Sequence, residues 1–306
     1  MDTNYYNKTG ETKSQRVQIT TARVFSYIFL GFVTILALFP ILILVINTTR
    51  DRFALQGGFS LIPGASFAEN LSHTLYGDND PNSTFNTTQV PILRGMLNSL
   101  IVAGSSCLLT TYFSAMTAYG IHVYDFKGKK FVFNFILIIM MIPTQVSSVG
   151  FVNLVDSMKL MNTYAPLIIP AIAAPAVFFY MKQYLESSFP LEVVEAARVD
   201  GCNEFRTFNM IALPMMKPAI AVQLIFSFVA SWNNFFTPSL ILRNGGDEIK
   251  TVPILIQKLS SSILSGGADW GQVYMTVFLS IIPVVIIYFF VSKNIVEGVA
   301  LGAVKG

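Results

Sequence analysis

Residues 24–46 read VFSYIFLGFVTILALFPILILVI, an apolar segment without a charged side chain, and its length sets the class of fold. A helix needs roughly 20 apolar residues to cross the hydrocarbon core of a bilayer. A polar segment with Lys8, Lys13, Arg16 and Arg23 precedes the apolar one, and no small-residue cleavage site follows it. A signal peptide has a shorter apolar region and such a cleavage site, so we expect a retained first membrane-spanning helix.

Five further segments have a similar length and apolar character. Together with the first, the expected spans are Val24–Ile46, Met96–Ile121, Phe131–Gly150, Tyr164–Met181, Pro218–Leu242 and Trp270–Val291. Hydrophobic residues make up 53% of the chain and charged residues 12%, whereas about a quarter of the residues in a soluble domain are charged. The sequence therefore predicts an all-α integral membrane protein with six transmembrane helices.

The Lys and Arg residues set the expected orientation, because cytoplasmic loops are enriched in them. With the N-terminus inside, the cytoplasmic loops hold most of these residues, so we expect both termini in the cytoplasm. The chain then divides into a cytoplasmic tail (1–23), a first helix (24–46), an extracellular insertion (47–93), a core of five helices (94–292) with a long cytoplasmic loop (187–214), and a cytoplasmic tail (293–306). The net charge of +3 is spread along the chain and argues against a nucleic-acid partner.

The expected spans hold no Asp, Glu, Lys, Arg or His side chain well inside them. Carriers driven by protons or sodium usually need such groups in the membrane, so the sequence favours an external energy source or a passive channel. The nearest match to a phosphate-binding loop, Gly128-Lys129-Lys130, lacks the first glycine and the hydroxyl residue. Cys107 and Cys202 have no metal-ligand spacing. We therefore expect no catalytic residue, metal site or cofactor on this chain, and any ATPase must be a partner chain.

Uncharged polar and aromatic side chains within the spans are candidates for a solute path. They are Asn98 in the second span and Ser231, Trp232, Asn233 and Asn234 in the fifth. Amides and hydroxyls can donate and accept hydrogen bonds, and Trp232 offers a flat face to a sugar ring, so the pattern predicts a neutral polyhydroxylated solute. The alternative is that these side chains hold the helices together through interhelical hydrogen bonds.

Residues 187–201, SSFPLEVVEAARVDG, lie between the fourth and fifth spans and predict a short helix. Ser187 or Ser188 can cap its N-terminus, and Gly201 permits a left-handed exit. A second short helix is expected over residues 203–214, where the chain turns back into the membrane. The two helices would form a compact projection on the cytoplasmic face.

Three groups of residues in this loop match a known family. They are Glu195-Ala196-Ala197, Asp200-Gly201 and Ile211-x-Leu213-Pro214, and they resemble the EAA loop of permease subunits in binding-protein-dependent ABC importers. Further agreement comes from Asn98-Ser99-Leu100, Asn162-Thr163-Tyr164, Trp232-Asn233 and the tail from Val296 to Gly306. The pattern is similar to that of MalG-type permeases of carbohydrate importers, over nearly the whole chain except the N-terminal tail and the outer insertion.

This resemblance implies the type I permease fold of ABC importers and a transmembrane subunit of an ATP-driven importer for a sugar, in particular an oligosaccharide. The residues that it assigns to coupling with the ATPase are Glu195, Ala196, Ala197, Asp200 and Gly201, and a flexible tail with Gly298, Gly302 and Lys305 would reach the ATPase interface. The implied partners are a homologous second permease subunit, two ATP-binding cassette ATPase subunits, an extracellular solute-binding lipoprotein, a neutral oligosaccharide and membrane lipid. Closure of the ATPases on ATP would move the chain between inward- and outward-open states in a bacterial cytoplasmic membrane.

Two other functions stay open at this point. The first is an ABC permease for another solute, such as a polyamine or an anion, although an anion calls for basic residues in the path and the expected spans hold none. The second is a membrane scaffold that holds partners and shows no ATP-dependent uptake. An enzyme is disfavoured, because the spans contain no paired carboxylates, Ser/His pair or metal cluster.

Overall fold

The computed structural model describes residues 13–77, 90–263 and 269–303, and the regular secondary structure of these residues is entirely helical. Within these described residues, four helices are long and apolar enough to cross a membrane, and the number rises to six if each of two sharply bent helix pairs counts as one span. The prediction of an all-α membrane protein is confirmed. The first, second, fourth and sixth expected spans overlap these four helices, the third overlaps the bent pair Lys129–Met140 and Thr144–Ser157, and the fifth overlaps Lys217–Trp232 of the other pair.

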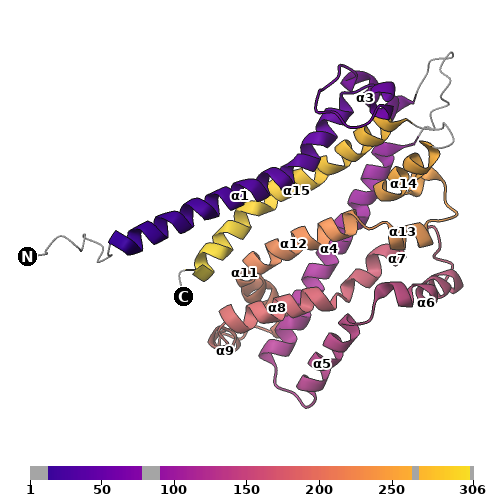
Figure 1. The fold of residues 1–306 in the computed structure, drawn as a ribbon. Coiled ribbons are helices and arrows are strands. Elements are labelled where there is room, and N and C mark those ends of the chain that lie inside the picture. The colour runs from indigo at the N-terminus through magenta and orange to yellow at the C-terminus, as the bar shows by residue number, and fades with distance from the viewer. Residues whose placement is uncertain (1–12, 78–89, 264–268, 304–306) are drawn as a thin grey trace, which may run out of the picture.

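Figure 1 shows the order of the helices. The longest are α1 (Lys13–Thr48), α4 (Ile92–Val123) and α15 (Trp270–Ala303). The others are α2 (Arg52–Gln56), α3 (Phe67–Tyr76), α5 (Lys129–Met140), α6 (Thr144–Ser157), α7 (Ala165–Ile168), η1 (Ile169–Ile172), α8 (Pro175–Ser188), α9 (Glu192–Val199), α10 (Glu204–Thr207), η2 (Phe208–Ala212), α11 (Leu213–Met215), α12 (Lys217–Trp232), α13 (Phe236–Ile241), η3 (Asp247–Ile249) and α14 (Val252–Ser262).

α4 is the central helix of the bundle. It packs mainly against α12 and α8, and also against α7, η1 and α14 (Figure 1). Its buried side carries small and hydroxyl-bearing residues, among them Ala103, Ser106, Cys107, Thr110, Thr111, Ser114, Ala115 and Ala118. Small side chains let the backbones of membrane helices approach closely, so this composition explains why α4 takes the central place.

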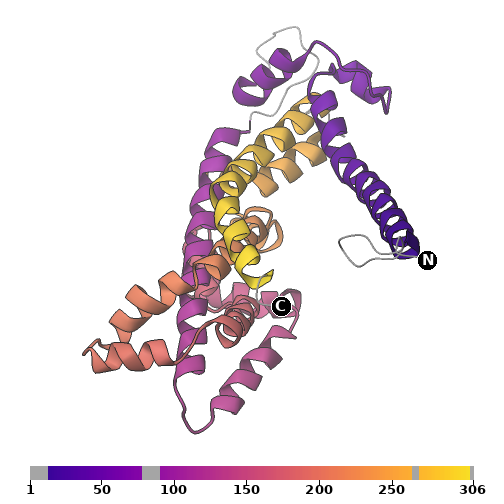
Figure 2. The ribbon, with the colours of Figure 1, turned by 90° about the vertical axis from the view of Figure 1, so that its left-hand side faces the viewer.

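α1 stands apart from the rest of the bundle along most of its length. It meets α15 at the end where α2 and α3 lie, and it diverges from α15 towards the N-terminus (Figure 2). From Val24 to Leu42 all its side chains are exposed, and Phe25, for example, is 70% exposed. A helix that is apolar on every side suits a lipid environment.

The third expected span, Phe131–Gly150, is wrong as a single straight helix. α5 ends at Met140, α6 begins at Thr144, and the two helices are bent by 94°. Pro143 lies at the break in an extended conformation. Proline lacks a backbone N–H and disfavours the helical conformation in the residue before it, so this apolar run is long enough for one span but is divided by its proline.

The fifth expected span, Pro218–Leu242, is also divided. α12 ends at Trp232 and α13 begins at Phe236, so three residues separate the two helices. α12 also follows the helical run Glu204–Met215, and these two are bent by 81°. In a continuous helix the ring of Pro238 would collide with the carbonyl group of Asn234, which accounts for the break between α12 and α13.

The fourth span combines α7, η1 and α8, and α4 supplies hydrogen bonds where this span is interrupted. Pro175 has no N–H to donate to the carbonyl oxygen of Ala171, and the hydroxyl of Thr110 donates to that oxygen instead, at 2.9 Å. Ser106 and Ser114, one turn away on either side, make longer bonds of 3.3 and 3.4 Å to carbonyl oxygens of the same span. These hydroxyls satisfy main-chain groups that would be costly to leave unpaired inside a membrane.

Candidate functional site

A short helix, α9, projects at the end of the bundle where α8 finishes, at the lower left of Figure 1. Two of its side chains face the bundle: Val194 is 1% exposed and Ala197 is 4% exposed. Glu195 and Ala196, which lie between them in sequence, are exposed. α9 therefore presents an acidic and a small side chain outwards, whereas the second alanine of the predicted coupling group packs against its own chain.

α9 packs against a group of buried aromatic side chains. Val194 belongs to a buried cluster that includes Tyr119 of α4, Phe189 and Phe208 of η2. The ring centroids of Tyr119 and Phe208 lie 5.3 Å apart, and those of Tyr119 and Phe189 lie 6.3 Å apart. Because close-packed interiors have low compressibility and transmit strain, a displacement of α9 is passed on to the helices beneath it.

The C-terminal end of α9 has the left-handed exit that the sequence predicts. Gly201 has a φ of 77°, and its N–H donates to the carbonyl oxygen of Arg198 at 3.0 Å. The N–H of Cys202 donates to the carbonyl oxygen of Ala197 at 2.9 Å, which completes a Schellman motif. Asp200 is exposed at the C-cap position, and Gly201 is exposed after it. Of the predicted coupling residues from Glu195 to Gly201, Ala197 is therefore the buried one.

The N-terminal end of α9 differs from the prediction. α8 continues through Ser188, and Leu191 takes the N-cap position of α9 without a side-chain hydrogen bond. The hydroxyl of Ser187 donates to the carbonyl oxygen of Tyr184 at 3.0 Å, within α8. The prediction that a serine caps α9 is therefore wrong, because both serines belong to the last turn of the preceding helix.

The second helix of the projection is confirmed. α10, η2 and α11 form one helical run, Glu204–Met215, with a π-helical turn in its middle. The side-chain oxygen of Asn203 caps this run by accepting a bond from the N–H of Arg206 at 2.9 Å. Across the turn between the two helices, Arg198 Nε donates to Glu204 Oε1 at 2.8 Å.

A cavity of about 810 Å³ lies between α4, α6, η1, α12 and α13. The residues that line it are all uncharged, and those with polar side chains are Ser106, Thr110, Thr144, Ser147, Ser148, Ser227, Ser231, Asn234 and Thr237. Ser227 and Ser231 lie one turn apart on α12 and so share one face, and Asn234 lies two residues beyond the end of this helix. Within the described part of the chain the Ser227 hydroxyl is buried without a hydrogen-bond partner.

Only part of the predicted solute path lines this cavity. Ser231 and Asn234 do, whereas Trp232 and Asn233 do not. Trp232 is 3% exposed, and its ring stacks on that of Phe228 with 5.6 Å between centroids. Asn233 is exposed just after the end of α12. The four-residue spacing of Ser227 and Ser231 is the signal in the sequence that marks the cavity face of α12.

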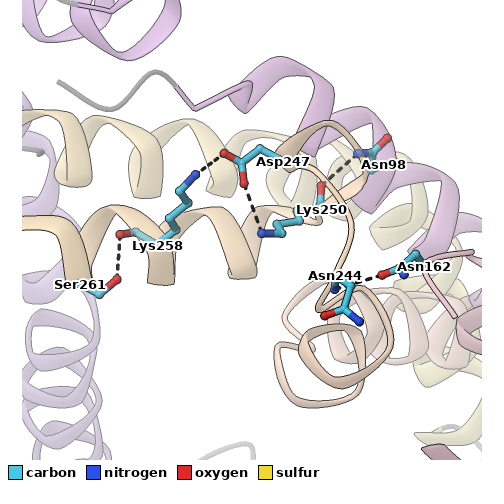
Figure 3. Close-up of polar contacts among 7 residues, drawn as sticks. All are labelled: Asn98, Asn162, Asn244, Asp247, Lys250, Lys258 and Ser261. Atoms are coloured by element: carbon cyan, nitrogen blue, oxygen red, sulfur yellow. Dashed lines mark hydrogen bonds and ion pairs between the residues drawn. The ribbon is translucent and has the colours of Figure 1, made fainter. Parts of the chain in front are cut away.

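Asn98 lies away from this cavity, at the start of α4, and holds the loop between α13 and α14 (Figure 3). Its side-chain nitrogen donates to the carbonyl oxygens of Glu248, at 2.7 Å, and Lys250, at 3.0 Å. The hydroxyl of the neighbouring Ser99 accepts a bond from the N–H of Val252 at 2.8 Å. Buried amides that satisfy main-chain groups in this way organise a loop, so the structure places Asn98 in a packing position.

A second pair of residues ties down the same loop from the segment before α7. The side-chain oxygen of Asn162 accepts a bond from the N–H of Asn244 at 3.2 Å (Figure 3), and the hydroxyl of Tyr164 donates to the carbonyl oxygen of Ile249 at 3.0 Å. Asn162 has a φ of 59°, a left-handed conformation that asparagine tolerates better than most residues. The motifs that begin with Asn98 and Asn162 thus both anchor the loop between α13 and α14.

Asp247 adds ion pairs to this loop. Its carboxylate pairs with Lys258 of α14, and its second oxygen lies 3.3 Å from Lys250 Nζ (Figure 3). Burial raises the pKa of Asp247, but hydrogen bonds and charge interactions with Lys258 and Lys250 outweigh that effect and hold the pKa below its ordinary value. Because the folded-state pKa is lowered, the carboxylate stabilises the fold above pH about 4 and loses this contribution as the pH falls through the folded-state value.

Asp247→Asn is expected to lower the unfolding temperature of the detergent-solubilised chain by about 2–4 °C at pH 7, the shift for roughly 1 kcal/mol in a chain of this size. The difference from wild type should vanish as the pH falls well below 4, where both chains carry a neutral side chain. Thermal unfolding followed by circular dichroism measures both. Asp156→Asn, at an exposed site on α6, is the control; an equal shift in both variants, or one that persists in acid, would contradict this role.

The C-terminal residues expected to form a flexible tail are helical as far as they are described. α15 continues from Trp270 through Ala303, so Gly298 and Gly302 lie on this helix. The prediction of a flexible segment is therefore wrong over residues 298–303. Lys305 lies outside the described residues.

A polytopic helical bundle with an uncharged cavity and a short helix pair at one end defines a membrane permease. The chain matches the model of the family described as binding-protein-dependent transport system inner membrane component over residues 110–299, and it belongs to that family. The family that the Glu195-Ala196-Ala197 region indicates is thereby confirmed. The chain is a transport permease subunit.

Three relatives illustrate the range of named solutes in the family. The arabinooligosaccharides permease AraQ of Bacillus subtilis (strain 168) is 32% identical, over 94% of this chain and 98% of AraQ. The lactose permease LacG of Rhizobium radiobacter is 27% identical, over 92% and 96% of the two chains. The sn-glycerol-3-phosphate permease UgpE of Escherichia coli (strain K12) is 28% identical, over 90% and 95%.

A solved structure supports the fold. A chain of a bacterial ABC transporter that imports the acidic polysaccharide alginate superposes with a TM-score of 0.72, at 20% identity, over 92% of this chain and 98% of that one. A second structure, in which the alginate transporter is bound to a periplasmic protein carrying an alginate pentasaccharide, gives a TM-score of 0.56 at 18% identity. The expected type I permease fold of ABC importers is thereby confirmed.

Proposed function

We propose that this chain is one transmembrane subunit of an ATP-driven importer for a neutral oligosaccharide in a bacterial cytoplasmic membrane. The observation that carries the proposal is the construction of α9. Glu195 and Ala196 are exposed for a partner, while Val194 and Ala197 fix the same helix to the core of the bundle. A helix built in this way takes up a force on its outer side and passes it into the membrane helices.

The partner at α9 is an ATPase, which supplies the energy that the uncharged spans do not derive from an ion gradient. Two ATPase copies hold ATP and Mg, a homologous second permease completes the path, and an extracellular lipoprotein delivers the solute. The family match supports a solute-binding partner through its name. The distribution of Lys and Arg supports cytoplasmic termini and a cytoplasmic position for α9.

The cavity supports a neutral solute. Its polar groups are hydroxyls and one amide, which suit sugar hydroxyls and offer an anion no charge partner. The relatives named for arabinooligosaccharides and lactose agree with this assignment. The second candidate is an anionic solute, favoured by the relative named for sn-glycerol 3-phosphate.

ATP hydrolysis by the reconstituted complex, purified through this chain together with its binding protein, tests the proposal. The solute panel is arabinotriose, lactose, an alginate trisaccharide and sn-glycerol 3-phosphate. Stimulation by arabinotriose or lactose alone supports the neutral assignment. Stimulation by one of the two anions alone transfers the assignment to the second candidate, and a complex without an ATPase overturns the importer.

Ser231→Ala and Asn234→Ala are each expected to raise the half-saturation concentration for uptake by about 2- to 10-fold, the loss of one neutral hydrogen bond, with little change in the amount of assembled complex. Uptake kinetics in proteoliposomes measure the effect. Ser239→Ala is the matched control, because Ser239 of α13 lies outside the cavity lining and its hydroxyl bonds to its own helix. Unchanged kinetics in both cavity variants would assign these side chains to helix packing.

A further inference from the structure

Arg198, in the last turn of α9, touches two other elements of the structure. Its guanidinium lies over the ring of Tyr124, with 5.6 Å from Cζ to the ring centroid. Its Nε donates to Glu204 Oε1 at 2.8 Å. Tyr124 is the C-cap residue of α4 and Glu204 is the first residue of α10. One side chain therefore joins α9 to the end of the central helix and to the start of the run that leads into α12.

The Arg198 contact also involves the turn at Gly201, because Gly201 lies between Arg198 and Glu204 in the chain. Gly201 has a φ of 77°, and no atom beyond its immediate neighbours comes within 4 Å of the position that a Cβ would take there. The turn therefore has free space beside Gly201 and is closed by the two main-chain hydrogen bonds of the Schellman motif, with α9 on one side and α10 on the other. Arg198 and Glu204 lie on opposite sides of Gly201 along the chain, so their ion pair spans this turn.

The buried contacts of α9 with the bundle run along one line of the helix. Val194 and Ala197 face the core one turn apart, which fixes the distance between α9 and the bundle. Rotation about that line of contact changes the direction in which Glu195 points. The Tyr124–Arg198–Glu204 contact lies at the end of the line and opposes such rotation, because a planar guanidinium that stacks and bonds at once has one favourable orientation.

We propose that Arg198 is a positioning residue, which holds α9 at a fixed angle to α4 and α10 so that motion of the ATPase is converted into motion of the membrane helices. This inference rests on the proposed function of α9 as the site of contact with the ATPase. The ion pair is about 40% exposed on both sides, and exposed pairs add little to stability. Its loss should therefore affect coupling rather than folding.

The test compares Arg198→Gln, Glu204→Gln and the double variant in the reconstituted complex, with arabinotriose and lactose as solutes. Each single variant should raise the number of ATP molecules hydrolysed per sugar imported by about 2- to 10-fold, at an unchanged level of assembled complex. The double variant should be no worse than either single one, because both remove the same contact. Arg206→Gln, which changes an exposed arginine on the neighbouring helical run, is the control and should leave the ratio unchanged.

Three results would overturn the proposal. If only Arg198→Gln raises the ratio, or if the two effects multiply, Arg198 acts by touching the ATPase directly rather than through Glu204. Hydrogen exchange of residues 192–201 in the same complex gives a readout that needs no transport: both single variants should speed it equally, and unchanged exchange contradicts the positioning role. A complex in which no sugar stimulates the ATPase, but in which exchange rises as expected, would refute the proposed function and support the contact itself.

Discussion

Glu195→Lys is expected to reduce uptake by more than about thirtyfold, because a reversed charge in a docked interface costs several kcal/mol. Glu195 is exposed on α9, so the substitution leaves the buried side of the helix intact. The chain should therefore insert and fold as the wild type does. Sugar uptake and stimulated ATP hydrolysis by the reconstituted complex measure the loss, and membrane immunoblots measure the amount of chain.

Asp125→Lys is the matched control for this charge reversal. Asp125 is exposed in the loop between α4 and α5, on the same predicted face of the membrane, and does not belong to α9. It should retain uptake within about twofold of wild type, as surface substitutions away from special features usually do. Normal uptake in Glu195→Lys, or an equal loss in Asp125→Lys, would remove the basis for assigning contact with the ATPase to α9.

Gly201→Pro is expected to reduce uptake by at least about tenfold, the effect of a 1.4 kcal/mol change in a coupled equilibrium. Proline fixes φ near −65°, whereas Gly201 has a φ of 77°. Proline also removes the N–H that bonds to the carbonyl oxygen of Arg198. The turn must then change shape, and α9 can no longer hold its angle to α10. Uptake and the level of inserted chain are the measurements.

Gly201→Ala tests whether a substitution at Gly201 acts through the backbone conformation or through the space that a side chain needs. An added Cβ meets no atom within 4 Å, so only the strain of the left-handed conformation, about 1–2 kcal/mol, remains. This variant should keep its hydrogen bonds and lose less uptake than Gly201→Pro. Equal losses of uptake in the two variants would mean that a partner contacts the chain at Gly201 and tolerates no side chain there. No loss of uptake in either variant would show that the turn is not needed for coupling.

The ends of the long apolar helices follow closely from composition. The first expected span, Val24–Ile46, lies within the membrane-spanning part of α1, Arg23–Thr48, and the second lies within α4. Apolar length is a local property that any bilayer imposes, so it can be read without knowing the neighbours of a helix. The prolines at 143 and 238 carry local signals too, and the divided third and fifth spans follow from them once proline is given priority over apolar length.

The side of each helix that a residue occupies depended on the neighbouring helices. Ala196 and Ala197 are adjacent and identical, yet one is exposed and the other packs on the core. Asn98 and Asn234 are both amides in expected spans, yet the first binds a loop and the second lines the cavity. Spacing within a helix assigns residues to a common face, but only the partners of that face decide whether it meets lipid, solvent or protein.

By itself, the amino-acid sequence determined the helical membrane class, the family, the absence of Asp, Glu, Lys, Arg and His deep within the expected spans, and the left-handed turn at Gly201, because each depends on residue type at short range. Tertiary structure alone decided that Thr110 would supply the bond missing at Pro175, that Ser227 would face a cavity, and that Arg198 would meet Tyr124. These contacts join residues far apart in the chain, or depend on where separate helices cross. Their formation is set by the packing of whole helices against α4, which no local pattern specifies.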